Sequence, residues 1–307
     1  MGKCIIVVGQ GRSGTSLVAN ILSSFGIFVE NTITTDRFNE KGYWESKQLV
    51  QINDSILETF GGKWPSFYVM PDGWEKSSRM IPMQEQSIEF LKGMNEYDVW
   101  AIKDPRLSVT FPFWARILPR DRKIILCARN PISVSRSLNS VASLDLRSGS
   151  RLWFATNLSA IKNIANEETI IVTYEKLILN PEKEATRIAK FALDSEDVKP
   201  SSTLKTIVSS NLSHFNYTLD DLISSREICW ESKLLYLLLL EFEIKSCALN
   251  DFGRSLDMGD ISHWSKLSED YLSLADEIKE CRDKYDNLVK HPYVRIGVKI
   301  KSLLNRF

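Results

Sequence analysis

The fold is decided by residues 3–16, KCIIVVGQGRSGTS. Residues 3–9 are a continuous apolar, β-branched run, which is typical of a central parallel strand covered on both faces. A Gly-rich turn follows, and residues 15–26 have the apolar spacing of a helix that stops near Gly26. Backbone N–H groups in such a turn, together with the positive end of the helix, form a cradle for an anion.

The same alternation of strand and helix continues along the chain. Further strands are predicted at 98–104, 123–129 and 169–175, and helices at 45–60, 83–95, 110–118, after Pro131, at 150–166 and at 181–193. Segments 31–44 and 61–82 are predicted to be loops. Strands that alternate with helices imply an α/β fold with a parallel sheet flanked by helices.

The strand signal fades after about residue 195, and 219–246 and 265–286 are predicted to be helical. We therefore expect one domain over 1–286, with an α/β core at about 3–193 and a helical part at about 195–286.

Composition excludes several classes of protein. The 307 residues include 39 Lys+Arg and 39 Asp+Glu, so the formal net charge is zero, which argues against a nucleic-acid binder. The neutral charge and an aromatic content of 10% argue against a disordered chain. The five cysteines form no C-x-x-C pair and the three histidines are scattered, so we predict no metal site.

The C-terminal segment 287–307 differs from the rest, because residues 288–307 contain five Lys/Arg and no acid. At helical spacing, its apolar and basic residues fall on opposite faces. It is either a terminal helix packed on the domain or a helix that contacts a membrane surface or a partner. No signal sequence or membrane span is apparent, so we expect a cytoplasmic protein. In the second case, the helix would give it peripheral contact with the inner membrane surface.

The Gly-rich loop departs from the phosphate loop of nucleotide hydrolases, G-x-x-x-x-G-K-[ST]. Gly9 and Gly14 fit that pattern, but Thr15 stands where the Lys is required, and the cation of the loop is Arg12. Taken alone, the loop could be an ordinary turn between a strand and a helix.

A second basic element follows a later strand. Arg129 ends the strand predicted at 123–129, and Ser137 lies eight residues on, in the following helix. Arg129 should emerge at the carboxyl edge of the sheet, where open α/β sheets bind ligands. Its guanidinium suits a phosphate because it can donate two parallel hydrogen bonds. Taken singly, Arg129 could equally be an ion-pair residue. Together with the first loop, it indicates a binding site for a second phosphate.

With the two elements GQGRSGTS and CARNPISVSRSL, the chain resembles the sulfotransferases that use 3′-phosphoadenosine 5′-phosphosulfate (PAPS), over residues 3 to about 193. The resemblance implies a phosphate-loop, nucleotide-kinase-like sulfotransferase architecture with PAPS as co-substrate and no metal. It also implies that the adenine lies near Tyr174, in VTYEKLILNP, and that the 3′-phosphate is bound by Arg129 and Ser137. The 5′-phosphosulfate would be bound by the loop residues Gly11, Arg12, Ser13, Gly14, Thr15 and Ser16.

The resemblance is closest to the bacterial-type branch, with NEKGYWE at 39–45 and IKDPR at 102–106. The cytosolic small-molecule branch has a catalytic His where this chain has Pro105, so another base is required. Glu45 is our candidate, with Glu40 and Asp104 as rivals, although Glu45 could instead be a helix-start residue. Lys103 would neutralise charge on the moving sulfuryl group, while Arg12 and the loop amides hold the phosphosulfate bridge.

The predicted function is transfer of a sulfuryl group from PAPS to an acceptor hydroxyl, on a carbohydrate or a glycolipid. Two alternatives remain open at this point. One is a phosphate-loop nucleoside-phosphate kinase, and the other is a non-catalytic anion-binding scaffold protein.

Overall fold

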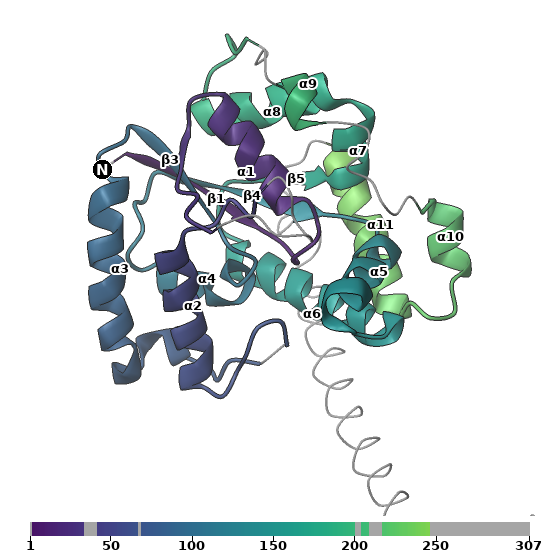
Figure 1. Ribbon diagram of the computed structural model, residues 1–307, viewed down its shortest axis with the longest axis horizontal. Helices are drawn as coiled ribbons and strands as arrows, with labels where there is room; N and C mark the ends of the chain where they lie inside the picture. The colour runs from purple at the N-terminus through teal and green to yellow at the C-terminus, as the bar shows by residue number, and fades with distance from the viewer. Residues whose placement is uncertain (1, 34–41, 67–68, 200–203, 209–216, 246–307) are drawn as a thin grey trace, which may run out of the picture. The chain divides into compact units, whose positions relative to one another are not determined.

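Five parallel strands form a single sheet in the order β2-β3-β1-β4-β5, with β1 at its centre (Figure 1). The computed structural model describes residues 2–33, 42–66, 69–199, 204–208 and 217–245. The strands are β1 Lys3–Val8, β2 Phe28–Val29, β3 Val99–Lys103, β4 Arg122–Ala128 and β5 Thr169–Thr173. The predicted α/β fold with a parallel sheet is confirmed.

Helices cover both faces of this sheet. They are α1 Thr15–Ser24, α2 Lys47–Thr59, α3 Ile81–Met94, α4 Leu107–Trp114, α5 Pro131–Ala142, α6 Leu146–Ile164, α7 Tyr174–Leu179, α8 Pro181–Leu193, α9 Leu204–Ile207, α10 Leu219–Ser224 and α11 Trp230–Lys245, with 3₁₀ turns at Trp74–Lys76 and Ser78–Met80. Figure 1 shows α1, α8 and α9 on one side of the sheet, and α2, α3, α4 and α6 on the other.

The core follows from the strand sequences. Alternate strand residues, among them Ile5, Val7 and Cys127, pack in one cluster with the apolar faces of α1, α8 and α9. The intervening β1 residues, Cys4 and Ile6, are also fully buried. A strand buried on both faces needs an unbroken apolar run, which is what the sequence supplies.

Local sequence fixes where the helices begin. Ser46 caps α2 by accepting a hydrogen bond from the Leu49 amide, at 3.3 Å. Asn130 caps α5 in the same way through the Ile132 amide, at 3.0 Å, and Pro131 occupies the first turn. These caps place the first turn of α5 directly after the end of β4.

Some sequence expectations need correction. The last predicted strand stops at Thr173, and α7 begins at Tyr174, because β4 ends at Ala128 and leaves β5 no partner beyond that pair. Strand β2 was not predicted, because its two residues are too few to show the periodicity of a strand. The predicted helix at 219–246 is two helices, separated after Ser225, which has an extended backbone.

Residues 265–286 and 287–307, for which helices are predicted, lie outside the described residues, as does the boundary between them. Within the described ranges, no helix is both long enough and apolar enough to span a bilayer.

Two glycines allow the loop after β1 to approach its neighbours. Gly9 has φ +130°, and a Cβ built there would lie 2.3 Å from the carbonyl oxygen of Cys127 in β4. Gly14, the N-cap of α1, has φ +91°, and its Cβ would lie 2.7 Å from the ring of Tyr174. Both positions therefore require glycine.

We expect Gly9→Ala to destabilise the protein by at least about 1–3 kcal/mol, because it adds backbone strain and a clash with β4. The control is Gly93→Ala in α3, where a Cβ meets nothing within 4 Å and should be neutral or stabilise by up to about 1 kcal/mol. Urea denaturation of the two variants measures the difference. Equal stabilities would contradict the packing argument.

Candidate functional site

The predicted site residues lie at the carboxyl edge of the sheet, where consecutive strands end. The Gly-rich loop follows β1, Lys103 ends β3, Arg129 follows β4, and Tyr174 follows β5. Because β1 lies between β3 and β4, the three segments that leave these strands are neighbours. Ligands of open α/β sheets bind at this kind of edge, where the strand order reverses.

Side chains of two helices accept hydrogen bonds from the backbone of the Gly-rich loop. The Gly9 amide donates to the hydroxyl of Ser108 in α4, at 3.1 Å, and the Gln10 amide donates to Asn157 in α6, at 3.4 Å. The Ser13 amide donates to the Gln10 carbonyl, at 3.1 Å. These three amides are used within the protein, so an anion would be held by other amides of the loop and of the first turn of α1.

Ser108 and Asn157 are supporting residues that sequence reasoning missed. Both are fully buried, and each lies about 100 or more residues from the loop along the chain. No local motif marks them.

The two predicted anion-binding elements contact each other directly. Arg12, which has a left-handed φ of +75°, donates through Nε to the hydroxyl of Ser137 in α5, at 2.8 Å. Arg129 donates to the Arg12 carbonyl, at 3.4 Å. Arg12 therefore connects the Gly-rich loop directly to the second element, through its side chain and through its carbonyl.

Tyr174 joins these groups from the side of β5. The guanidinium carbon of Arg129 lies 4.1 Å from the centroid of the Tyr174 ring, a cation–π contact. The same ring lies against Gly14. Burial lowers the pKa of Arg129, with Arg12 adding a smaller effect in the same direction, and burial raises the pKa of the Tyr174 phenol. Two guanidinium groups so close together form a site that favours an anion.

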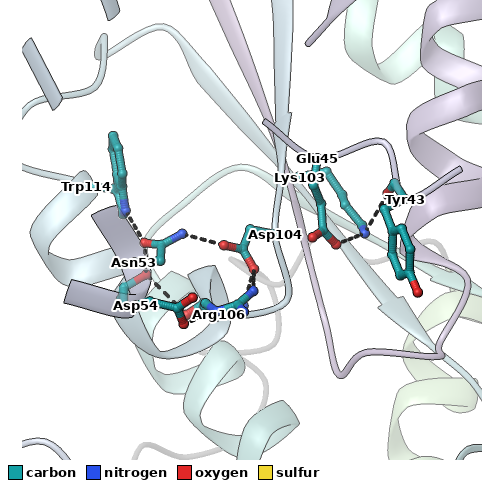
Figure 2. Close-up of polar contacts among 9 residues, drawn as sticks. Tyr43, Glu45, Asn53, Asp54, Lys103, Asp104, Arg106 and Trp114 are labelled. Atoms are coloured by element: carbon teal, nitrogen blue, oxygen red, sulfur yellow. Dashed lines mark hydrogen bonds and ion pairs between the residues drawn. The ribbon is translucent and has the colours of Figure 1, made fainter. Parts of the chain in front are cut away.

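Glu45 and Lys103 form a buried ion pair at the end of β3 (Figure 2). Lys103 also donates to the carbonyl oxygen of Tyr43, at 2.9 Å, and the hydroxyl of Ser16 in α1 donates to the same oxygen, at 3.0 Å. The Tyr43 carbonyl thus connects the pair to the helix that begins at the loop. Burial raises the pKa of the Glu45 carboxyl, and Lys103 opposes this shift.

Asp104, the rival base, has a different environment. Its carboxylate is fully buried and accepts from the Asn53 side chain, at 2.8 Å, and from the backbone and guanidinium of Arg106, both at 3.0 Å (Figure 2). Asn53 in turn accepts from the Trp114 indole, at 2.7 Å, and Arg106 donates to Asp54, at 2.6 Å. These contacts give Asp104 a role in fixing the start of α4. Glu40 lies outside the described residues.

Trp64 is a further residue at this edge that sequence reasoning did not single out. A Cβ on Gly11 would lie 3.4 Å from its ring and 3.7 Å from Pro105, which places Gly11 between the two. The Arg106 guanidinium lies over the same ring, 5.5 Å from its centroid. Trp64 itself is only partly buried. Trp64 therefore lies beside the loop as a partly buried aromatic residue.

No group of three or more His, Cys, Asp or Glu residues suited to a metal ion occurs in the described part of the chain.

Comparison with solved structures finds bacterial sulfotransferases. The sulfotransferase domain of the Synechococcus PCC 7002 olefin synthase is 17% identical, with 78% of this chain and 94% of that chain covered and a TM-score of 0.44. Sulfotransferase STF1 from Mycobacterium tuberculosis H37Rv is 15% identical, with 76% of each chain covered and a TM-score of 0.45. Sulfotransferase STF9 from Mycobacterium avium is 14% identical, with 71% and 69% covered and a TM-score of 0.40.

No curated protein matches the sequence significantly. The family assignment therefore rests on a family model described as "Sulfotransferase family", which matches residues 4–193. That range is more than half of the 307 residues and contains every described residue of the predicted site. The chain belongs to the sulfotransferase family.

Proposed function

We propose that this sulfotransferase moves a sulfuryl group from PAPS to a hydroxyl group of a carbohydrate or glycolipid. The observation that carries the choice of donor is the Arg12–Ser137 contact, at 2.8 Å, with Arg129 beside it. It joins the loop suited to a 5′-phosphosulfate to the element suited to a 3′-phosphate. PAPS carries both groups on one nucleotide, whereas ATP offers no 3′-phosphate.

In the proposed step, the acceptor oxygen forms a bond to sulfur while the bond between sulfur and the bridging oxygen of the donor breaks. The leaving product is 3′,5′-phosphoadenosine. Such a transfer depends on an in-line arrangement of the two oxygens and on stabilisation of the charge that develops. Lys103 has three N–H donors, and within the described residues Glu45 and Tyr43 accept two of them; the third would donate to the sulfuryl oxygens.

The hydroxyl proton of the acceptor would go to Glu45. Its carboxylate is paired with the Lys103 that would contact the sulfuryl group, so base and transferred group would lie close together. The burial that raises the Glu45 pKa makes the carboxylate a stronger base than an exposed Glu, and it remains a carboxylate above that pKa.

Trp64 supports a carbohydrate as the acceptor. The residue is only partly buried and lies beside Gly11 and Pro105, close to the end of β3 where Lys103 emerges. Aromatic rings offer a flat apolar surface with little conformational entropy to lose, which suits the apolar face of a sugar ring. A cytoplasmic location and membrane contact through residues 287–307 stay predictions from the sequence.

We expect Arg129→Ala to weaken binding of 3′,5′-phosphoadenosine by about 1.5–3 kcal/mol, roughly ten- to a hundredfold, because a charge-assisted bond to the 3′-phosphate is lost. Binding of AMP, which has no 3′-phosphate, should change little. Isothermal titration calorimetry measures both affinities. Arg136→Ala, at an exposed position of α5, is the matched control. Equal losses for the two nucleotides would contradict the assignment of Arg129.

We expect Glu45→Gln to lower kcat by a factor of about 10²–10⁴, because the amide cannot accept the acceptor's proton. Affinity for 3′,5′-phosphoadenosine should be nearly unchanged. Turnover of labelled PAPS against a panel of glycan, lipid and phenolic acceptors measures the rate, with Glu58→Gln at an exposed position of α2 as the control. Near-normal turnover in Glu45→Gln would move the role to Glu40 or Asp104.

The pH profile gives an independent check of the same role. Because the Glu45 pKa is raised, the carboxylate is protonated, and the base lost, as pH falls through a value above that of an ordinary Glu. The rate of the wild-type protein should therefore fall on the acid side within that range. A rate that stays constant down to the pKa of an exposed Glu would contradict the assignment.

We expect binding and turnover to persist in EDTA, because a sulfuryl group carries less charge than a terminal phosphoryl group and Arg12, Arg129 and Lys103 supply positive charge. A nucleotide kinase would instead bind ATP with Mg²⁺. Titration with 3′,5′-phosphoadenosine and with ATP, each in EDTA and in Mg²⁺, separates the two functions. Mg²⁺-dependent ATP binding without any response to the bisphosphate would favour the kinase. Bisphosphate binding without turnover on any acceptor, together with no effect of Glu45→Gln, would favour the scaffold.

A further inference from the structure

We propose that Glu175 and Tyr236 are positioning residues that hold Arg129 in place for a nucleotide 3′-phosphate, which makes α11 part of the donor-binding machinery. The proposal rests on the proposed function, since it assumes that Arg129 binds that phosphate.

One partly buried carboxylate connects the segment after β4 to α11. Glu175, the second residue of α7, accepts from the Asn130 backbone amide at 2.8 Å and, through its other oxygen, from the Tyr236 hydroxyl at 2.8 Å. Asn130 directly follows Arg129, and Glu175 directly follows Tyr174, the residue on whose ring the Arg129 guanidinium lies. Glu175 therefore fixes the distance between the segment that carries the guanidinium and the ring that supports it.

Asn130 is held at each of its polar groups. Besides the bond from its amide to Glu175, its side-chain oxygen caps α5, and its side-chain nitrogen donates to the carbonyls of Tyr217, at 3.1 Å, and Thr218, at 3.3 Å. The residue is only 1% exposed. The backbone next to Arg129 thus has little freedom, and an anion that binds there pays little to order it.

Tyr236 is well suited to hold the carboxylate. It is 1% exposed, and its ring packs edge-on against Trp153, with centroids 6.1 Å apart. Burial, with the carboxylate of Glu175 adding to it, raises the pKa of the phenol, so the hydroxyl stays protonated and continues to donate. A hydrogen bond donated to a carboxylate is among the stronger ones. Its donor, Tyr236, lies more than 100 positions after Arg129 in the sequence.

The test compares two nucleotides that differ in the 3′-phosphate. We expect Tyr236→Phe, which removes one oxygen, to weaken binding of 3′,5′-phosphoadenosine about three- to tenfold and to leave AMP binding nearly unchanged. Glu175→Gln, which removes the charge, should lose at least as much. Tyr97→Phe is the matched control, because Tyr97 precedes β3 at the opposite edge of the sheet and stacks on Phe28.

A double variant separates positioning from general destabilisation. If Tyr236 acts through Arg129, then adding Tyr236→Phe to Arg129→Ala should cause no further loss of bisphosphate affinity. Independent, additive losses would overturn the inference, as would equal losses for the bisphosphate and AMP in the single variants.

The melting temperature of each variant is measured as well. If Tyr236→Phe lowers it strongly, the ratio of bisphosphate affinity to AMP affinity is taken from Glu175→Gln instead. Wild-type protein that does not bind the bisphosphate would contradict the proposed function, and this inference with it. If the wild-type protein binds the bisphosphate, but the ratio of bisphosphate affinity to AMP affinity is unchanged in both Tyr236→Phe and Glu175→Gln, only this inference is overturned.

Discussion

The central strand β1 pairs with β3 on one side and β4 on the other, and the candidate site depends on that double pairing. Val7 is in register with Lys103 of β3 and with Ile125 of β4, so the chain leaves all three strands at one edge. The close contact between Gly9 and the Cys127 carbonyl keeps the loop against β4 as it turns into α1. The main chain thus brings Arg12, Lys103 and Arg129 to one edge of the sheet before any side chain contributes.

The charged groups of the site contact polar or aromatic partners, because burying an unpaired charge costs free energy of desolvation. Lys103 has a carboxylate and a carbonyl, and Arg129 has an aromatic ring and a carbonyl. Removing one member of such a pair leaves an uncompensated buried charge, which is costlier than losing both. A ligand whose own negative charge balances Arg12 and Arg129 is therefore favoured at the site.

The helical segment after residue 195 is tied to the sheet, although its sequence carries no motif. Glu243 of α11 accepts from the Thr173 amide at the end of β5, at 2.9 Å, and from Arg187 of α8, at 3.3 Å. Tyr236, two helical turns earlier, reaches Glu175. The bond from the Thr173 amide to Glu243 gives the end of β5 a partner in α11, because β4 pairs with β5 no further than Thr173.

The sequence by itself determined the strand–loop–helix unit at residues 3–26, the alternation that makes a parallel sheet, and the residues that carry charge to its carboxyl edge. These depend on local periodicity and on glycine, proline and capping residues, which act over a few positions. The resemblance to the sulfotransferases, rather than local periodicity, marks Arg129 and Ser137 as one element.

Only the tertiary structure decided which of these groups meet. It set the order of the strands, placed Arg12 on Ser137, paired Glu45 with Lys103, committed Asp104 to Asn53 and Arg106, and joined Glu175 to Tyr236. Most of these contacts join residues 50 to 125 positions apart. A contact over such a separation depends on strand order and helix packing, and no local pattern in the sequence encodes either.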